Sequence, residues 1–272
     1  MTSAQSISVL GCGWLGLPLA QRLVQLKFSV KGSSTTQSKL PLLERSKIKP
    51  FLITATPRLA GENIDSFFQS DILFLNIPFR RNLEDPVYYK EQIDAVISSV
   101  ISSSVRFVIF SGSTSIYPES VKEALEDTPM AVDNDRSKVL QEVERALFGQ
   151  TEFETTVIRF AGLYGGDRTI GRMLAGRKGV VEGKAPVNLI HLEDCIEIVT
   201  QIIQKNIRGE IFNACSDGHP AREVIYTKAA LHYGYEPPQF IDQPARRSKI
   251  VSNAKLKNRL QYVFHYPDPL VF

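Results

Sequence analysis

The feature that most constrains this chain is a glycine-rich segment near its start, with glycines at positions 11, 13 and 16. It directly follows the β-type run Ile7–Leu10 and opens a stretch in which leucines recur at helical spacing. Between a strand and a helix, the first glycine permits a tight turn, the second lets a phosphate approach the backbone, and the third allows close helix–strand packing. The helix N-terminus then offers N–H groups and a favourable dipole to phosphates. The sequence therefore predicts a dinucleotide pyrophosphate site made by Gly11, Cys12, Gly13, Trp14, Leu15 and Gly16.

The residues after the next predicted strand indicate which dinucleotide the turn would hold. A site for NAD usually carries Asp or Glu about 20 residues past the turn, where the carboxylate accepts from the ribose 2′-OH. Residues 31–39, Lys-Gly-Ser-Ser-Thr-Thr-Gln-Ser-Lys, contain no carboxylate. Hydroxyl groups and a lysine suit a 2′-phosphate, which a carboxylate would repel. We therefore expect NADP rather than NAD, with a solvated loop without selectivity as the alternative. The expected phosphate contacts are Ser33, Ser34, Thr35 and Lys39.

Short β-branched runs alternate with helical patterns along most of the chain, which is typical of a parallel sheet with crossover helices. Strands are expected at 7–10, 28–31, 51–53, 71–75, 106–110 and 155–160, and helices at 15–26, 86–103 and 136–149. The predicted fold is α/β, a doubly wound parallel Rossmann sheet with a small C-terminal substrate lobe. Asn76, Ile77 and Pro78 end the fourth strand at the carboxyl edge of the sheet, where ligands lie in such folds. They are expected to form a wall of the cofactor site, although the proline also explains why the strand stops.

Beyond residue 165 the pattern loosens, because frequent glycines indicate loops. A helix is expected at 193–205, a strand at 211–213 and a helix at 221–233. We predict a dinucleotide-binding domain at 1–165 and a small substrate-binding lobe over most of 166–272, with the strand at 211–214 returning to the sheet.

Composition excludes several classes of function. The net charge of +3 comes from 32 basic and 29 acidic residues spread along the chain, whereas nucleic-acid binding needs a dense basic face. The three cysteines are far apart and the four histidines lack paired spacing, so neither a disulfide framework nor a metal site is predicted. No stretch approaches the roughly 20 apolar residues of a membrane helix. A cytoplasmic protein that acts on a small molecule is expected, and its oligomeric state is not predicted.

Four further segments, together with the glycine turn, carry a family resemblance. They are 110–117 (FSGSTSIY, similar to S-S-x-x-V-Y-G), 158–165 (IRFAGLYG, similar to L-R-x-x-x-x-Y-G), 188–194 (NLIHLED, similar to I-H-V-x-D) and 209–214 (GEIFNA, similar to G-x-x-Y-N-V). In this order they resemble the extended and atypical short-chain dehydrogenase/reductases, the group of NAD-dependent epimerase/dehydratases. The resemblance covers nearly the whole chain and implies an oxidoreductase or epimerase/dehydratase.

The family reaction that the resemblance implies uses three residues. A Ser or Thr orients the substrate oxygen, a Tyr transfers a proton, and a Lys four residues later holds the nicotinamide ribose and lowers the pKa of the tyrosine. Ser113 falls on the serine position. Lys138, in the S-K-x-x-x-E segment 137–142, falls on the lysine position. Asn134 stands where the family has its tyrosine, and an amide cannot exchange a proton at physiological pH.

Three interpretations follow from Asn134. The chain binds NADP(H) without turnover, as a regulator or sensor; or another group, Tyr117, Tyr164 or Asp94, supplies the proton; or hydride transfer proceeds with a proton relayed by water. The two tyrosines also have a structural explanation as residues that shape the cleft, and Asp94 as a solvated residue on a helix.

The substrate side is predicted from residues that the resemblance places near the second lobe. Tyr164, Arg172 and His191 are the expected substrate contacts, with a half-buried histidine bonded to backbone as the alternative for His191. Related enzymes act on nucleotide sugars, and arginines bind a diphosphate through bidentate contacts. The candidate arginines and lysine, which a solvated face explains as well, are Arg168, Arg172, Arg177 and Lys178.

Overall fold

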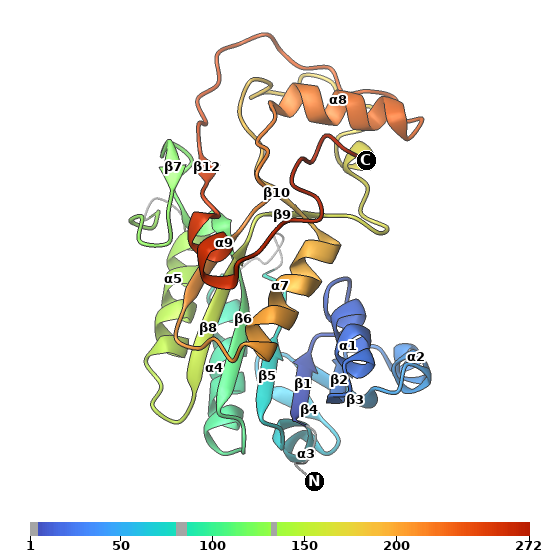
Figure 1. Cartoon of the computed structure of the whole chain (residues 1–272), viewed down its shortest axis with the longest axis vertical. Helices are drawn as coiled ribbons and strands as arrows, with labels where there is room; N and C mark the ends of the chain where they lie inside the picture. Colours follow the sequence, from blue (N-terminus) through green and yellow to red (C-terminus); the bar gives the residue numbers. More distant parts are fainter. Residues whose placement is uncertain (1–4, 80–85, 132–134) are drawn as a thin grey trace. The chain divides into compact units, whose positions relative to one another are not determined.

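The computed structural model describes residues 5–79, 86–131 and 135–272. A mostly parallel sheet of eight strands runs in the order β11-β8-β6-β5-β1-β2-β3-β4 (Figure 1). The strands are β1 (Ser6–Leu10), β2 (Ser29–Ser34), β3 (Lys49–Ala55), β4 (Leu59–Gly61), β5 (Ile72–Leu75), β6 (Phe107–Ser113), β8 (Glu154–Phe160) and β11 (Ile211–Ala214). The predicted doubly wound α/β sheet is therefore confirmed. β4 pairs antiparallel with β3, and the chain order reverses direction between β1 and β5, which is where dinucleotides bind in such sheets.

The residues group into two compact units, and the chain passes between them within β6, β8, β11 and helix α7 (Leu192–Gln204). The first unit lies within residues 1–112, 132–158 and 199–211, and the second within 113–131, 159–198 and 212–272. Residues 113–131 and 159–165, which the sequence assigns to the N-terminal domain, thus group with the second unit. Strand β11 lies at the edge of the large sheet.

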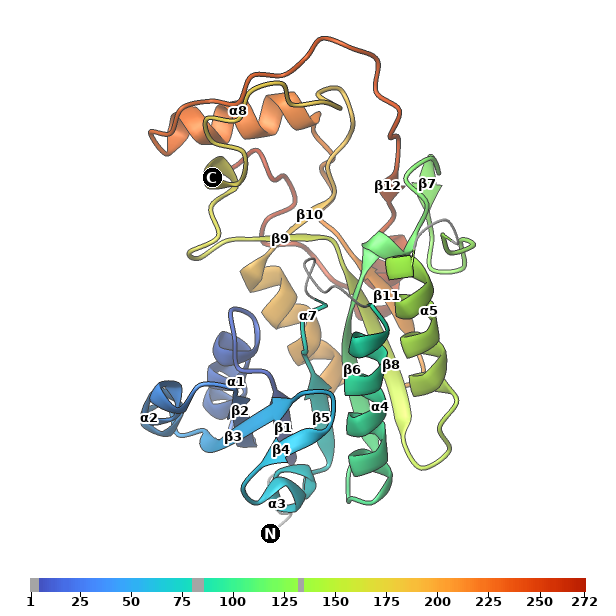
Figure 2. The ribbon, with the colours of Figure 1, turned by 180° about the vertical axis from the view of Figure 1, so that it is seen from behind.

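Helices cover both faces of the sheet in the first unit. α4 (Val87–Ile101) and α5 (Asp135–Phe148) pack together on the face seen in Figure 2, and α1 (Gly16–Gln25) covers the opposite face. The shorter helices are α2 (Leu40–Arg45), which follows the 3₁₀ turn Gln37–Lys39, and α3 (Ile64–Phe68). All four residues of β5 are buried, as expected for a central parallel strand covered on both faces.

The second unit contains two short parallel strand pairs. β9 (Gly162–Tyr164) pairs with β10 (Leu189–His191), and β7 (Glu123–Ala124) pairs with β12 (Ile250–Val251). Its helices are α6 (Ile170–Met173), α8 (Arg222–His232) and α9 (Ala254–Leu260), beside the 3₁₀ turn Thr114–Ile116. One apolar cluster of this unit consists of Tyr164, Ile170, Leu189, Ile225 and Ala229. These short strands and α9 were not predicted, because two to seven residues carry too little periodicity.

A buried carboxylate fixes the C-terminal segment to α7. Asp194, in the first turn of α7, accepts a hydrogen bond from the Tyr262 hydroxyl at 2.7 Å. It also accepts from the backbone N–H groups of His265 and Tyr266, at 2.8 and 3.1 Å. Each lone pair in use offsets the cost of burying the charge. In the part of the chain that the structure describes, no helix combines the length and apolar character needed to cross a membrane.

Candidate functional site

The three glycines of the turn have different surroundings. Gly11 has φ +105°, and a Cβ on it would collide with the carbonyl oxygen of Asn76. A Cβ on Gly16 would collide with the carbonyl oxygen of Gly11. By contrast, apart from Gly13 itself and its two chain neighbours, no atom of the described residues lies within 4 Å of a Cβ built on Gly13, which is exposed. The first and third glycines are thus required by the fold, whereas the second borders open space that a ligand can enter.

Two polar side chains brace this turn from the strands on either side. The Gly11 N–H donates to Oγ of Ser33, at the end of β2, over 2.9 Å. Nδ2 of Asn76, which follows β5, donates to the Gly11 carbonyl over 3.0 Å. The backbone adds a bond from the Cys12 N–H to the Ser33 carbonyl at 2.8 Å. The donor and the acceptor of Gly11 are both satisfied by neighbouring strands, so the turn is held in shape without a ligand.

The other side chains of the turn point mostly into the protein. Cys12 and Leu15 are buried, so that they can meet a ligand only through backbone groups. Burial raises the pKa of the Cys12 thiol to about 12, which keeps it protonated and unreactive. The first N–H groups of a helix lack intrahelical acceptors, and at the start of α1 they follow the open position Gly13. The cradle fits the pyrophosphate of a dinucleotide.

The predicted phosphate contacts after β2 divide into two kinds. Ser33 is only 2% exposed, and its hydroxyl accepts from the turn. Ser34 is also buried, and its Oγ accepts from the Thr36 N–H at 3.1 Å. Thr35 and Lys39 are exposed. Of the four predicted contacts, only Thr35 and Lys39 therefore have exposed side chains.

An aromatic pair and a cation lie just past the end of β5, in the first unit. The ring of Phe79, three residues after Asn76, stacks on Tyr89 of α4 with centroids 4.6 Å apart and planes at 7°. The guanidinium of Arg136, in the first turn of α5, lies 4.3 Å from the Phe79 centroid. The Tyr89 hydroxyl donates to the Ile77 carbonyl at 3.1 Å, and burial raises the pKa of this tyrosine. Sequence reasoning missed this group, since Phe79 and Arg136 are 57 positions apart.

Lys138 is exposed on α5. Its Nζ is 3.3 Å from the carboxylate of Asp135, and its side chain is 54% exposed. Glu142 and Arg145, on the same side of the helix, are exposed as well. Asn134 lies outside the described residues. Asp94, on α4, pairs with Lys90 at 2.6 Å as a partly exposed ion pair.

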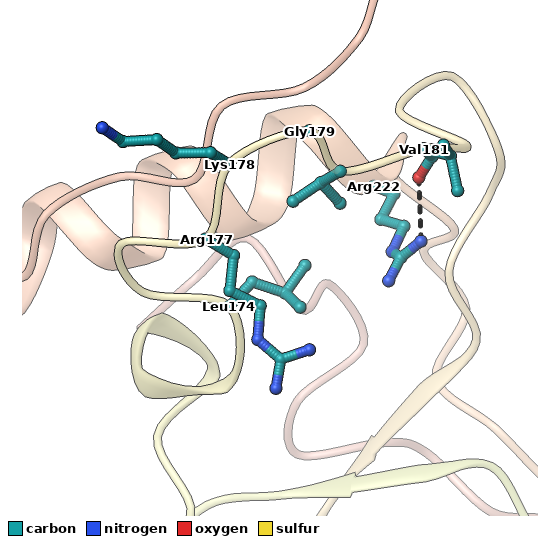
Figure 3. A pocket seen from close by; sticks show the side chains of 7 residues that line it. Leu174, Arg177, Lys178, Gly179, Val181 and Arg222 are labelled. Carbon is teal, nitrogen blue, oxygen red and sulfur yellow. Dashed lines mark hydrogen bonds between the residues drawn. The ribbon is translucent and has the colours of Figure 1, made fainter.

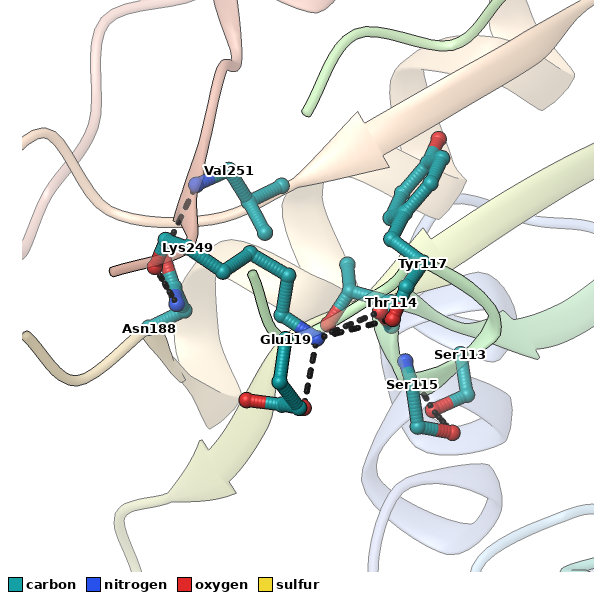
Figure 4. A network of polar contacts seen from close by, with 8 residues as sticks. All are labelled: Ser113, Thr114, Ser115, Tyr117, Glu119, Asn188, Lys249 and Val251. Carbon is teal, nitrogen blue, oxygen red and sulfur yellow. Dashed lines mark hydrogen bonds and ion pairs between the residues drawn. The ribbon is translucent and has the colours of Figure 1, made fainter. Parts of the chain in front are cut away.

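Ser113 begins a tight turn in the second unit (Figure 4). Its Oγ accepts from the Ser115 N–H at 3.2 Å and lies 2.9 Å from the Ser115 hydroxyl. The ammonium of the buried Lys249 approaches the carbonyls of Thr114 and Tyr117 at 3.3 and 3.4 Å, and it pairs with Glu119 at 2.8 Å. The turn that presents Ser113 is therefore fixed at both ends.

Tyr117 is committed to a buried network of the second unit. Its hydroxyl donates to Oδ1 of Asn213 at 2.8 Å and accepts from Nη1 of Arg159 at 2.5 Å. Arg159 is fully buried and also donates to the Glu126 carbonyl at 3.0 Å. Desolvation raises the pKa of Tyr117, although the Arg159 charge opposes this effect. A phenol in this setting cannot easily give up its proton.

His191 lies between two tyrosines of the second unit. Its ring centroid is 3.6 Å from that of Tyr266 and 5.1 Å from that of Tyr164. Nδ1 accepts from the Glu193 N–H at 3.3 Å at the start of α7, which matches the structural alternative for this histidine. Burial lowers the pKa of His191 and raises the pKa of Tyr164.

A small pocket of about 370 Å³ opens in the second unit (Figure 3). Its lining residues are Leu174, Arg177, Lys178, Gly179, Val180, Val181 and Arg222. Arg222 donates to the Val181 carbonyl at 2.9 Å, which fixes its guanidinium at the pocket. Arg172 is exposed on α6 and does not line the pocket. Arg222 was missed in the sequence, because it joins Arg177 only through folding of a chain segment 45 residues long.

No family model matches the sequence. Protein YeeZ of Escherichia coli K12 is 34% identical over 270 residues, which covers 98% of both chains. A putative NAD-dependent epimerase/dehydratase from Methylobacillus flagellatus has a similar structure, with a TM-score of 0.76, 24% identity, and coverage of 98% of this chain and 95% of that one. UDP-glucuronic acid 4-epimerase from Bacillus cereus, solved in complex with NAD, gives a TM-score of 0.77 at 17% identity, over 98% and 94% of the two chains. The chain therefore belongs to the same family as YeeZ, and it has the predicted fold of the NAD-dependent epimerase/dehydratases among the short-chain dehydrogenase/reductases.

Proposed function

We propose that this chain binds a nicotinamide dinucleotide on the turn from Gly11 to Gly16, and that it acts as an oxidoreductase or epimerase/dehydratase on a small polar substrate. The observation that carries the proposal is the braced turn, whose second glycine borders open space. The Bacillus cereus epimerase of the same fold was solved in complex with NAD, which supports this class of cofactor.

In this proposal the residues of the chain bind the cofactor and orient the substrate. Ser33 and Asn76 keep the turn in shape, and backbone N–H groups at the start of α1 receive the pyrophosphate. The nicotinamide, when bound, supplies or accepts a hydride. Ser113 accepts from the Ser115 N–H and shares a 2.9 Å hydrogen bond with the Ser115 hydroxyl; when Ser115 is the donor in that bond, the O–H of Ser113 can donate to a substrate oxygen.

We further propose NADP as the preferred cofactor. Residues 31–39 offer hydroxyl groups and lysines but no carboxylate, and Thr35 and Lys39 are exposed where a 2′-phosphate would bind. Ser34 would contribute to phosphate binding indirectly, because its hydrogen bond with Thr36 orders the segment after β2.

The substrate we propose is a small anionic molecule, with nucleotide sugars as the first class to test. Arg177 and Arg222 meet at one pocket beside the apolar side chains of Leu174 and Val181, an arrangement that suits a ring bearing phosphate or carboxylate groups. Tyr164, Arg172 and His191 stay predictions as substrate contacts.

The second candidate function is an NADP(H)-binding regulator without turnover. Asn134 cannot transfer a proton, and Tyr117 is buried in a network that keeps its proton. If the chain does catalyse a reaction, the proton must come through water or through a group other than Tyr117.

Titration of the purified chain with NADPH and NADH, followed by nicotinamide fluorescence, tests the proposal. We expect NADPH to bind more tightly, and Lys39→Ala to weaken NADPH about fivefold while leaving NADH unchanged, since an exposed charge pair contributes up to about 1 kcal/mol. Failure of both cofactors to bind would contradict the proposal. A screen of nucleotide sugars with the reduced and oxidised cofactor then separates the two functions. Turnover by the wild-type chain excludes the regulator. If the wild-type chain binds the cofactor without turnover, and Asn134→Tyr gains activity, the regulator is favoured.

A further inference from the structure

Lys249 is a buried cation whose hydrogen bonds all go to one short segment of the second unit (Figure 4). Its Nζ lies 3.3 Å from the Thr114 carbonyl, 3.4 Å from the Tyr117 carbonyl and 2.8 Å from Oε1 of Glu119. An ammonium has three N–H donors, and these three acceptors match them in number. Burial of a charge is unfavourable unless such acceptors replace the lost water, so the segment 114–119 is what permits the ammonium to lie there.

The backbone on either side of Lys249 is held independently of its side chain. Nδ2 of Asn188 donates to the Lys249 carbonyl at 2.8 Å, and Oδ1 of the same amide accepts from the Val251 N–H at 2.8 Å. Strand β12, which begins at the next residue, pairs with β7. The ammonium therefore reaches the segment 114–119 from a backbone that is fixed by other contacts.

The segment that receives the ammonium begins directly after Ser113. Thr114–Ile116 forms a 3₁₀ turn, and Ser113 caps it, since its Oγ accepts from the Ser115 N–H at 3.2 Å. Lys249 bonds to the carbonyls of the first residue of this turn and of its C-cap. A cation is favourable beside carbonyls at the C-terminal end of a helical turn. The cap at one end and the ammonium at the other thus act on the same short turn.

We propose that Lys249 is a positioning residue, which holds the 3₁₀ turn so that the Ser113 hydroxyl keeps the orientation needed to meet a substrate oxygen. This inference rests on the proposed function, in which Ser113 contacts the substrate. Lys249 lies 136 positions after Ser113 and outside every motif of the family resemblance. Glu119, whose side chain is 52% exposed, pairs with the ammonium but leaves the two carbonyl contacts to the lysine alone.

The test measures the geometry at position 113 without a substrate, through a thiol introduced by Ser113→Cys. The natural cysteines are buried, so iodoacetamide should alkylate only the introduced thiol. The thiolate is the reactive form, and a hydrogen bond from the Ser115 N–H stabilises it. The pH midpoint of alkylation therefore reports this hydrogen bond, whereas access of the reagent to the thiol changes the limiting rate at high pH.

In the Ser113→Cys background, Lys249→Met should raise this midpoint by about 0.3–1 pH unit, the scale of one hydrogen bond. Loss of a nearby positive charge would by itself raise the midpoint too, and Glu119→Gln distinguishes the two causes, because adding it to Lys249→Met restores the net charge. The midpoint should stay raised in this combination, since the turn still lacks its donor. Lys257→Met removes another lysine of the second unit, which pairs with Asp217 at 3.0 Å; it is the matched control and should leave the midpoint unchanged.

Three results would overturn the inference: an unchanged midpoint in Lys249→Met, an equal rise in Lys257→Met, or a full return to the original midpoint when Glu119→Gln is added. Thermal unfolding of each variant shows whether it folds. Should Lys249→Met fail to fold, Lys249→Gln takes its place; it removes the charge but keeps a polar end, so a smaller rise is expected, and no rise would count against the proposal. Wild-type protein that binds neither NADPH nor NADH would refute the proposed function instead, while the thiol would still report whether Lys249 holds the turn.

Discussion

The glycine turn and the segment Ser113–Tyr117 both carry family motifs, but their polar groups serve different ends. At the turn, the side chains of Ser33 and Asn76 satisfy Gly11, while the backbone beside Gly13 stays open. In the second segment, the Tyr117 hydroxyl is used internally by Arg159 and Asn213. One motif therefore leaves backbone groups open to its surroundings, whereas the tyrosine hydroxyl of the other takes part in the fold. A motif match in sequence does not distinguish these two situations.

The largest expected effect tests whether the Tyr117 network is structural. Arg159→Leu removes the buried cation and leaves the Tyr117 hydroxyl and the Glu126 carbonyl without this donor. The free energy of unfolding should fall by about 3–5 kcal/mol, the usual scale for breaking a buried charged network. Denaturant unfolding measures this change, with the exposed Arg145→Leu on α5 as the control. If Arg159→Leu lowers the free energy of unfolding no more than the control does, the Tyr117 network is not structural.

The next effect tests whether the space beside Gly13 belongs to a ligand. Gly13→Val places a side chain in open space at a position where φ is not left-handed, so stability should change by less than about 1 kcal/mol. Dinucleotide affinity should fall about tenfold to a hundredfold, as for overpacking by 1–3 kcal/mol. Gly16→Ala is the contrasting variant, because its methyl group meets the Gly11 carbonyl and should lower stability itself. Equal dinucleotide affinity in Gly13→Val and wild type would mean that the ligand binds elsewhere.

The smallest expected effect is a pH dependence of stability, which tests whether buried histidines of the second unit are uncharged in the folded chain. Burial lowers the pKa of His191 in the folded chain, while Glu193 and Asp194 oppose the shift. The unfolded chain therefore takes up the proton first, and stability that is present above pH of about 6.5 is lost as the pH falls below it. His219, whose pKa burial also lowers, acts in the same direction. Unfolding measured between neutral and mildly acidic pH should show a shallower decline in His191→Gln than in wild type, and parallel curves would exclude this role.

Most strands and helices of the first unit could be predicted, because local sequence patterns mark where they begin and end. The central strands are apolar runs, and the glycine turn has a spacing that few other structures require. The charges at 138, 142 and 145 also recur at helical spacing, and all three residues are exposed on α5, while the predicted cofactor role of Lys138 stays a prediction.

The partners of individual polar groups could not be predicted. Nothing in the sequence around Ser33 tells that its hydroxyl accepts from Gly11, because the two residues are 22 positions apart and meet only in the sheet. Arg159, within the predicted strand 155–160, signals an unusual buried charge, but the sequence does not show that it donates to the Tyr117 hydroxyl and the Glu126 carbonyl. Such pairings depend on tertiary geometry and not on periodicity.

The hydrogen bond from Gly11 to Ser33 has a consequence for how cofactor preference can evolve. An acidic residue at position 33, the kind that selects NAD in other sheets, would place a charge where only 2% of the present side chain is exposed. Selectivity is more easily altered in the exposed neighbours 35–39, which can change without disturbing the turn. Under the proposed function, the ability to hold a dinucleotide and the choice between dinucleotides are assigned to different residues, so that mutation can act on the second while the first is preserved.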